Sequence, residues 1–427
     1  MDNESFEARL RGVPDGGVTS ARGFRAAGVH AGFRKNPERL DFALIAAEHP
    51  VAAAGVFTQN RFCAAPVTVS RAHLSRAHLG GVGYGHIRAL AVNSGNANAA
   101  TGEDGLRVAR STCDIVSQVL ACEPDEVLVA STGVIGQQLP LEPFEQGVPA
   151  AADALSPAGG AAAARAIMTT DTRPKEYAVT YVSADPAYAG AVFTVGGMCK
   201  GSGMIMPNMA TMIACLTTDA PVEPACLHEA LRATVDRTFN CVTVDSDTST
   251  NDTCVLLASG EAAPEGAAPI QAGTLAASEF ESALYVVCEA LARAIAADGE
   301  GASRLVTVTV TGAASDAEAD VAARAVANSP LVKCAIAGHD CNWGRVAAAL
   351  GKSGAAFDAE NVAIDIMGIP VCRGGLTVPF DEDEALRRFE APEIFITADL
   401  GAGAGAARVW TCDLTHDYVT INGDYRT

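Results

Sequence analysis

Apolar residues recur along this chain with two different spacings, one typical of strands and the other typical of helices. Alternating or continuous apolar runs predict strands at 39–47, 86–92, 126–130, 176–182, 191–195, 241–244, 253–258, 304–311, 393–399 and 408–414. Apolar positions three and four residues apart predict helices at 103–120, 224–238 and 279–297, and the alanine-rich stretch 158–164 is expected to begin another. Because strands and helices alternate along the chain, the pattern is typical of an α/β protein.

Two stretches outside these elements, 262–271 and the C-terminus, have patterns of their own. Residues 262–271 are rich in proline, glycine and alanine, which is typical of a surface linker. Residues 418–421 alternate like a strand and lead directly into the final segment 422–427. We therefore expect the end of the chain to hold a defined position, although chain ends are usually frayed.

The acidic balance of the chain limits its partners. Its 427 residues carry a formal net charge of -20. A surface of this sign repels nucleic-acid phosphates and anionic lipid headgroups, so we expect neither a nucleic acid nor a membrane as partner. The longest apolar helix candidate, 283–297, contains Glu289 and Arg293, which argues against a membrane span. The acidic segment 1–9 has no apolar core typical of a signal peptide, and we expect a cytoplasmic protein.

The cysteines show no framework of regular spacings. There are 13 of them, an odd number, and no two are separated by two residues. Disulfide frameworks and zinc sites both depend on regular or paired spacing. We therefore expect reduced, mostly buried thiols and no metal site.

The densest chemical signal is the run from Lys200 to Met212, which contains two glycines near its start and Thr211 near its end. A phosphate-binding loop is one reading, but Lys200 precedes the glycines, whereas that motif places its lysine after them. A threonine hydroxyl needs a base to act as a nucleophile. If the Ala210–Thr211 bond breaks, the new α-amine, with a pKa of roughly 7.7–8.0, can be that base. The simpler alternative is a threonine at the start of a strand.

The segment 200–220, KGSGMIMPNMATMIACLTTDA, closely resembles the cleavage segment of the ornithine acetyltransferase / glutamate N-acetyltransferase (ArgJ) family. Departures from the family pattern are Met206 before Pro207, Ser246 where glycine is common, and Cys341 before Asn342. Nine shorter motifs follow in family order: GVFTQN at 55–60, AAPV at 64–67, NSGNAN at 93–98, STGVIG at 131–136, MTTDT at 168–172, DTSTND at 247–252, DGEG at 298–301, NWGR at 342–345 and INGDYRT at 421–427.

The resemblance implies a layered α/β (α+β) sandwich of mixed sheets flanked by helices, with a smaller α/β C-terminal domain. Self-cleavage would give an α chain of residues 1–210 and a β chain of residues 211–427, whose segment 211–300 completes the sandwich. The C-terminal domain would span about 302–415, and the tail 416–427 would return to the active site. The chains are expected to associate as a heterotetramer of two α and two β chains, with no cofactor.

The resemblance also implies roles for individual residues. Thr132 and Gly133 would form the oxyanion hole, because a hydroxyl and a backbone N–H can stabilise a tetrahedral oxyanion. Lys200 would pair with a substrate carboxylate, and Glu300 with the ornithine ammonium. Without the family, these residues suit a turn after a strand, a solvated lysine and a helix-end residue. The residues expected to contact substrate are Thr169, Lys200, Thr211, Glu300, Asn422 and Thr427, while Asn342 and Arg345 are expected to be structural.

The implied reaction is a ping-pong acetyl transfer from N2-acetyl-L-ornithine to L-glutamate through an acetyl ester on Thr211. Family members differ in whether they also use acetyl-CoA as donor, and no single residue decides this. Two alternatives stay open. An aminopeptidase or amidase related by fold would also self-cleave but would release its product to water. A regulatory or binding protein would remain uncleaved.

Overall fold

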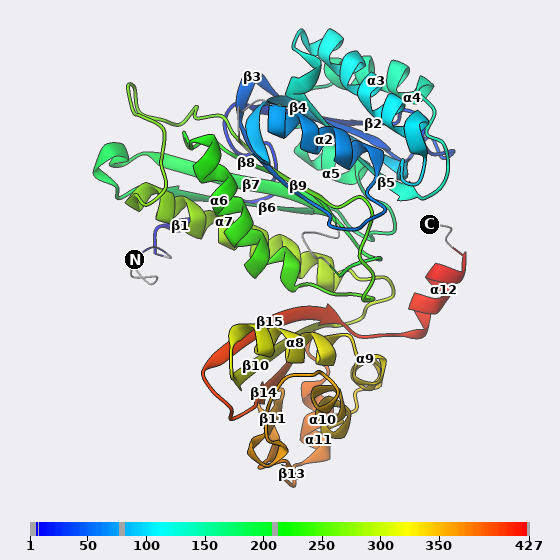
Figure 1. Ribbon diagram of the computed structural model, residues 1–427, viewed down its shortest axis with the longest axis vertical. Helices are drawn as coiled ribbons and strands as arrows, with labels where there is room; N and C mark the ends of the chain where they lie inside the picture. The colour runs from blue at the N-terminus through cyan, green and yellow to red at the C-terminus, as the bar shows by residue number, and fades with distance from the viewer. Residues whose placement is uncertain (1–5, 7, 77–81, 207–211, 425–427) are drawn as a thin grey trace.

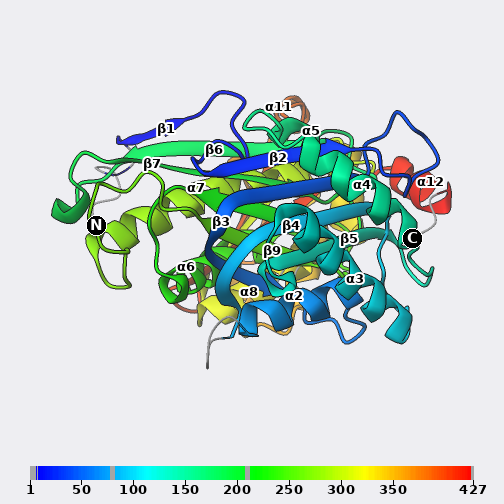
Figure 2. The same cartoon turned by 90° about the horizontal axis from the view of Figure 1, so that it is seen from above.

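The structure is a computed structural model that describes residue 6 and residues 8–76, 82–206 and 212–424 (Figure 1). These residues form a nine-stranded sheet and a six-stranded sheet. The larger sheet and its helices make up the upper body in Figure 1, and the smaller sheet lies below it. Strand β1 and helix α12 stand at opposite sides of the molecule in both views (Figures 1 and 2).

The larger sheet is mixed, because β4 and β8 run parallel to β5 and β9 while its other pairs are antiparallel. One edge of the long strand β3 pairs with β4, and its other edge pairs first with β2 and then with β9. The strands, in spatial order, are β1 (Leu10–Gly12), β6 (Lys175–Val182), β7 (Val192–Lys200), β8 (Ile213–Thr218), β9 (Thr253–Ala258), β3 (Phe42–Phe57), β4 (Tyr84–Asn96) and β5 (Val127–Val134), with β2 (Phe24–Val29) beside β3.

Both faces of this sheet are buried, and the period-two direction of strand side chains explains how. In β8, Ala214 and Leu216 join a core under helices, while Ile213 and Cys215 join an inner core. That inner core also contains Leu90 of β4, so the two halves of the sheet pack face to face. This arrangement explains why the strands read as nearly continuous apolar runs in the sequence.

Helices cover the two outer faces and complete a sandwich of four layers. The layered α/β sandwich implied by the resemblance is confirmed. On one outer face, α7 (Leu275–Ala297) packs against β6 and β7, and α6 (Pro224–Arg237) packs beside α7 and against β3, β4 and β9. On the other outer face, over β3 to β5, lie α2 (Ala65–Arg76), α3 (Gly102–Leu120) and α4 (Glu142–Asp153). Helix α5 (Gly160–Ala166) packs against β2 and β3 and contributes to the inner core.

The smaller sheet has its own apolar core. Its β15 and β10 contact α7, and after β15 the chain turns back toward the larger body, where α12 (His416–Asp424) lies (Figure 1). The strands in order are β13 (Leu376–Thr377), β12 (Ile369–Arg373), β11 (Ala363–Ile366), β14 (Glu393–Asp399), β10 (Leu305–Ala313) and β15 (Gly405–Cys412). The helices are α8 (Asp316–Ala327), α9 (Pro330–Ala337), α10 (Trp343–Gly351) and α11 (Glu382–Arg388).

Most elements lie where the apolar pattern predicts them, and β9 and β14 match their predicted ranges. The predicted strand at 241–244 is wrong: the chain makes a 3-10 helix at Phe239–Cys241 and a single bridge between Val242 and Trp410. The predicted strand at 418–421 is also wrong, because these residues belong to helix α12. A stretch as short as 418–421 fits the surface of a helix as well as a strand, and no strand edge pairs with it here.

Ser246 adopts a φ of 67°. Side chains other than glycine rarely adopt this left-handed conformation, which accounts for glycine being common at this family position. Within the described residues, we find no helix that combines the length and apolarity needed to cross a membrane.

Candidate active site

A single cleft collects most of the residues that the sequence predicts to act on substrate. They come from β5, the turn after α5, the end of β7, the segment after α7, and α12. Met212 and Ile213 also line the cleft, whereas the predicted Ala210, Thr211 and Thr427 lie outside the described residues. The predicted residues that line the cleft are Thr132, Gly133, Thr169, Lys200, Glu300 and Asn422.

The end of β5 has a backbone that requires glycine. Gly133 has a φ of 130°, and a Cβ atom there would lie 2.3 Å from the carbonyl carbon of Gly95 on β4. The register between the two strands shifts at this point, around Asn96. Thr132 and Gly133 are each half-buried at the cleft wall. The close approach of the two strands thus leaves the Thr132–Gly133 backbone at the cleft in a conformation that few other sequences adopt.

Lys200 supplies the only cationic side chain among the described residues of the cleft wall. It is 7% exposed, and within the described part of the chain its ammonium makes no hydrogen bond or ion pair. Burial lowers the pKa of Lys200, and the negative charge of Asp171 is the strongest opposing influence. A buried cation that makes no hydrogen bond is costly, so this position suits the anionic group of a ligand.

Glu300 carries the charge opposite to that of Lys200 and is contacted by two segments of the chain. Its backbone N–H donates to the Ser202 carbonyl at 3.0 Å, and its Oε2 accepts a hydrogen bond from Asn422 Nδ2 at 2.7 Å. A Cβ at Gly203 would lie 2.4 Å from Glu300 Cδ, so any larger residue there would displace the Glu300 carboxylate. The side chain is 6% exposed. Glu300 therefore offers a fixed carboxylate that suits a ligand ammonium.

Asp252 is a cleft residue to which sequence reasoning assigned no role. It is 1% exposed, and its Oδ2 has no hydrogen-bond partner among the described residues. Burial raises the pKa of this carboxyl well above its usual range, although the side chain of Ser249 and the charge of Lys200 oppose the shift. Its position at the end of the DTSTND motif, directly before a buried strand, was the available signal.

Asp245 also lines the cleft and was not predicted. Its carboxylate accepts the backbone N–H groups of Met204 at 2.6 Å and Ile205 at 2.8 Å. Burial raises its pKa, and these N–H groups partly oppose that rise. Met204 has a φ of 54°, so the two bonds fix an unusual turn in the segment that leads toward the predicted cleavage point.

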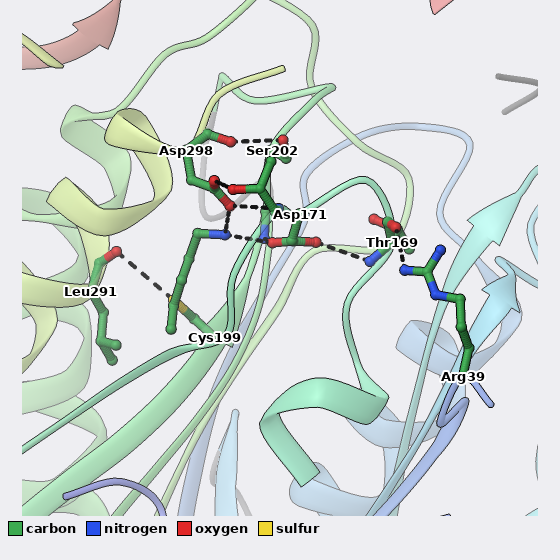
Figure 3. Close-up of polar contacts among 10 residues, drawn as sticks. Arg39, Thr169, Asp171, Cys199, Ser202, Leu291 and Asp298 are labelled. Carbon is green, nitrogen blue, oxygen red and sulfur yellow. Dashed lines mark hydrogen bonds and ion pairs between the residues drawn. The ribbon is translucent and has the colours of Figure 1, made fainter. Parts of the chain in front are cut away.

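A buried ion-pair network adjoins the segments that carry the cleft residues Thr169 and Lys200 (Figure 3). Lys175 Nζ contacts Asp171 Oδ1 at 2.7 Å and Asp298 Oδ2 at 2.6 Å. Ser202 Oγ donates to the Asp298 carbonyl at 2.7 Å. The network therefore links the start of β6, the segment after β7 and the end of α7, each of which leads to a residue of the cleft wall.

The cleft combines one cation with several carboxyl groups and the Thr132–Gly133 turn. Its carboxyl-bearing residues are Asp245, Asp247, Asp252 and Glu300. Among the described residues, no group of three or more histidine, cysteine, aspartate or glutamate side chains is arranged to hold a metal ion. This set of charges suits a small molecule that bears one carboxylate and at least one ammonium group.

Comparisons with known proteins agree on one family. The ArgJ family model matches residues 25–427. The arginine biosynthesis bifunctional protein ArgJ of Symbiobacterium thermophilum is 50% identical over 413 residues, which are 96% of this chain and 99% of that protein. The crystal structure of ArgJ from Bacillus halodurans is 43% identical, covers 49% of this chain and 97% of its own, and has a TM-score of 0.47. That of Mycobacterium tuberculosis ornithine acetyltransferase complexed with ornithine is 40% identical, covers 47% and 100%, and has a TM-score of 0.42.

Proposed function

Because the chain belongs to the ArgJ family of arginine biosynthesis, we propose that it transfers an acetyl group from N2-acetyl-L-ornithine to L-glutamate. The observation that carries this proposal is the pairing of Lys200 and Glu300 in one cleft. Both substrates share an α-carboxylate, which Lys200 would bind. Ornithine adds a side-chain ammonium, which Glu300 would bind. The relative from Mycobacterium tuberculosis whose structure contains ornithine supports this assignment.

In the proposed mechanism, Thr211 Oγ attacks the acetyl carbonyl and its own α-amine takes the proton. The developing oxyanion is stabilised by the Thr132 hydroxyl and the Gly133 N–H. Ornithine leaves with a proton from the amine, and an acetyl ester remains on Thr211. The amine of L-glutamate then attacks this ester and departs as N-acetyl-L-glutamate, which regenerates the threonine.

The α-amine becomes available only when the Ala210–Thr211 bond is cut, and we infer that the chain cuts this bond itself. The Thr211 hydroxyl would attack the Ala210 carbonyl, and water would hydrolyse the resulting ester. The family motif at 200–220 supports this step. Acetylornithine is proposed as the main donor. The word "bifunctional" in the names of relatives supports acetyl-CoA as a second donor.

The test is a steady-state assay of the purified protein with acetylornithine, in the presence and absence of glutamate. An acetyltransferase releases ornithine continuously only when glutamate is present. An amidase would release ornithine and acetate without glutamate, and a binding protein would release neither. Replacing acetylornithine by acetyl-CoA in parallel measures the second donor, and equal rates with both donors would contradict its minor role.

The nucleophile is tested with two substitutions of the same residue. Thr211→Ala removes the hydroxyl and should abolish both cleavage and transfer. Thr211→Ser keeps the hydroxyl and the amine, so it should retain part of each. Wild-type transfer by the alanine variant would require a different nucleophile.

A further inference from the structure

The buried carboxylate of Asp171 accepts backbone N–H groups from the two segments that carry Thr169 and Lys200 (Figure 3). We propose that Asp171 is a positioning residue for the substrate carboxylate, fixing the backbone at Thr169 and acting as the electrostatic partner of the Lys200 ammonium. The inference deepens the proposed function and rests on it for the identity of the ligand.

The first support for this role of Asp171 comes from its hydrogen bonds to the backbone. Asp171 is 6% exposed, and its Oδ2 accepts the N–H of Thr169 at 2.9 Å. Its Oδ1 accepts the N–H of Gly201 at 2.8 Å. Gly201 directly follows Lys200, so one carboxylate sets the backbone beside both cleft residues. Charge-assisted bonds of this kind are roughly twice as strong as neutral ones.

Asp171 is itself held from the other side of the sheet. Lys175 Nζ bridges Asp171 and Asp298, and Asp298 also accepts the N–H of Thr172 at 3.1 Å. On the strands, Lys175 is the partner of Cys199. Successive strand residues point to opposite faces, so Lys200 points away from Lys175 and toward the cleft. Asp171 therefore lies at the sheet end with an ammonium group on either face.

The second support for this role comes from the charge of Asp171. Burial lowers the pKa of Lys200, the Lys175 ammonium lowers it further, and Asp171, Glu300 and Asp252 raise it, with Asp171 contributing most. Burial alone would raise the pKa of Asp171, but the two lysines and the bonds it accepts lower it well below its usual range. Asp171 is thus a permanent anion beside Lys200, and without it Lys200 would lose its proton at a lower pH.

The test is Asp171→Asn, which keeps the side-chain size and removes the charge. We expect the KM for acetylornithine and for glutamate to rise about tenfold, the effect typical of a lost charged hydrogen bond. Because a protonated Lys200 binds the carboxylate, KM should increase with pH, and this increase should begin at a lower pH in the variant. Lowering the pH should partly restore the variant's KM. A purely structural defect would not be restored in this way.

Asp219→Asn is the matched control. Asp219 is 1% exposed and accepts the N–H of Thr194 at 2.7 Å, at the other end of β7. Its loss should lower the melting temperature and leave both KM values and their pH dependence unchanged. An Asp171→Asn variant with wild-type KM values, or with a raised KM that has the wild-type pH dependence, would overturn the proposal.

Two further measurements cover the remaining outcomes. If Asp171→Asn does not accumulate as a folded protein, Asp171→Glu is the substitute, because it keeps the charge but moves the carboxylate. It should raise KM without shifting the pH dependence of KM. A wild-type KM in this variant would refute the proposal. Titration calorimetry with ornithine compares the variants without turnover. An inactive wild type would contradict the proposed function, whereas equal ornithine affinity in wild type and Asp171→Asn would contradict this inference alone.

Discussion

At the scale of single residues, the cleft depends on groups held in costly environments. Gly133 adopts a backbone that few residues tolerate. Among the described residues, the buried Lys200 ammonium makes no hydrogen bond or ion pair, and one oxygen of the buried Asp252 carboxyl has no hydrogen-bond partner. Each such feature costs stability and persists because the surrounding sandwich imposes it. Substitution of such residues is expected to change stability and activity to different extents.

Substitutions at Thr132 and Gly133 should separate these two responses. Thr132→Ala is expected to lower kcat by about a hundred- to a thousandfold with little loss of stability, because one oxyanion donor is removed. Thr132→Ser keeps the hydroxyl and should recover most of the rate. Gly133→Ala should destabilise the protein by about 1–3 kcal/mol or more, since the added Cβ would clash with the β4 backbone. Single-turnover kinetics and denaturant unfolding measure the two effects, and a Thr132→Ala kcat equal to wild type would remove Thr132 from the oxyanion hole.

Asp252 should make the protein less stable as pH rises. An unfolded aspartate ionises near pH 3.9. Because burial raises the pKa of the folded carboxyl, the folded state keeps its proton above that pH while the unfolded state loses it. The contribution is present below the unfolded pKa and is lost as pH rises through the folded pKa. Asp252→Asn is neutral throughout, so its stability relative to wild type should increase with pH. If the melting temperatures of wild type and Asp252→Asn differ by the same amount at every pH from 4 to 8, this assignment is wrong.

At the scale of secondary structure, α12 is the element that ties the C-terminus to the cleft. None of its residues is buried, yet Asn422 donates to Glu300, and Thr415, directly before the helix, donates its Oγ1 hydrogen to the Gly301 carbonyl at 2.6 Å. A Cβ at Gly301 would lie 2.5 Å from the Tyr418 nitrogen, so glycine permits the close docking of this helix. Polar contacts and close backbone packing, with little apolar burial, hold it in place.

Substitutions within α12 should therefore affect substrate binding more than folding. Asn422→Ala removes the bond to Glu300 and should raise the KM for acetylornithine several-fold, with a melting temperature close to wild type. Val419→Ala is the control on the same helix, because Val419 is 72% exposed, and it should change neither quantity. Equal KM values in the two variants would show that Asn422 does not organise the cleft.

A C-terminal tag tests the expected placement of the chain end. We expect it to raise KM or abolish turnover while self-cleavage still occurs, because it moves the terminal carboxylate expected near the substrate and adds bulk after Thr427. The same tag at Met1 should be harmless. Wild-type kinetics with the C-terminal tag would make Thr427 an ordinary tail residue.

The sequence predicted these elements unevenly, for physical reasons. Strands buried on both faces, such as β9, can be predicted from their continuous runs of apolar residues. Helix α12 lacks a buried face, so its few apolar residues could not distinguish a helix from a strand. The family motifs located Lys200 and Glu300, but the contacts of Asp171 with Gly201 and of Asp245 with Met204 join residues 30 and 41 positions apart. No local spacing encodes such contacts.

At the scale of the whole molecule, the two pieces expected from cleavage are interwoven. Strand β7 belongs to the first piece and β8 to the second, and they pair from Val195–Thr218 to Lys200–Ile213 in the middle of the larger sheet. The Lys175–Asp298 ion pair also joins the two pieces. Separating them would expose both faces of a buried sheet, so packing alone should hold them together.

Purification should reveal this arrangement directly. A denaturing gel should show residues 1–210 and 211–427 as bands of similar size, and sequencing of the second should read Thr-Met-Ile-Ala-Cys. Native size exclusion should show both pieces in one peak, with a mass that reports whether two copies of each assemble. A fully active protein that runs as a single denatured band would refute the cleavage mechanism.

The adjacency of β7 and β8 has a consequence for how long the mature protein lasts. In the intact chain, the segment 201–212 keeps the two strands at a high effective concentration, so the sheet forms in a first-order process. After cleavage the same pairing requires an encounter between separate molecules, and refolding becomes second order. The precursor should therefore refold from denaturant at any dilution, while the cleaved protein should recover only at high concentration. Its working lifetime would then be set by its unfolding rate.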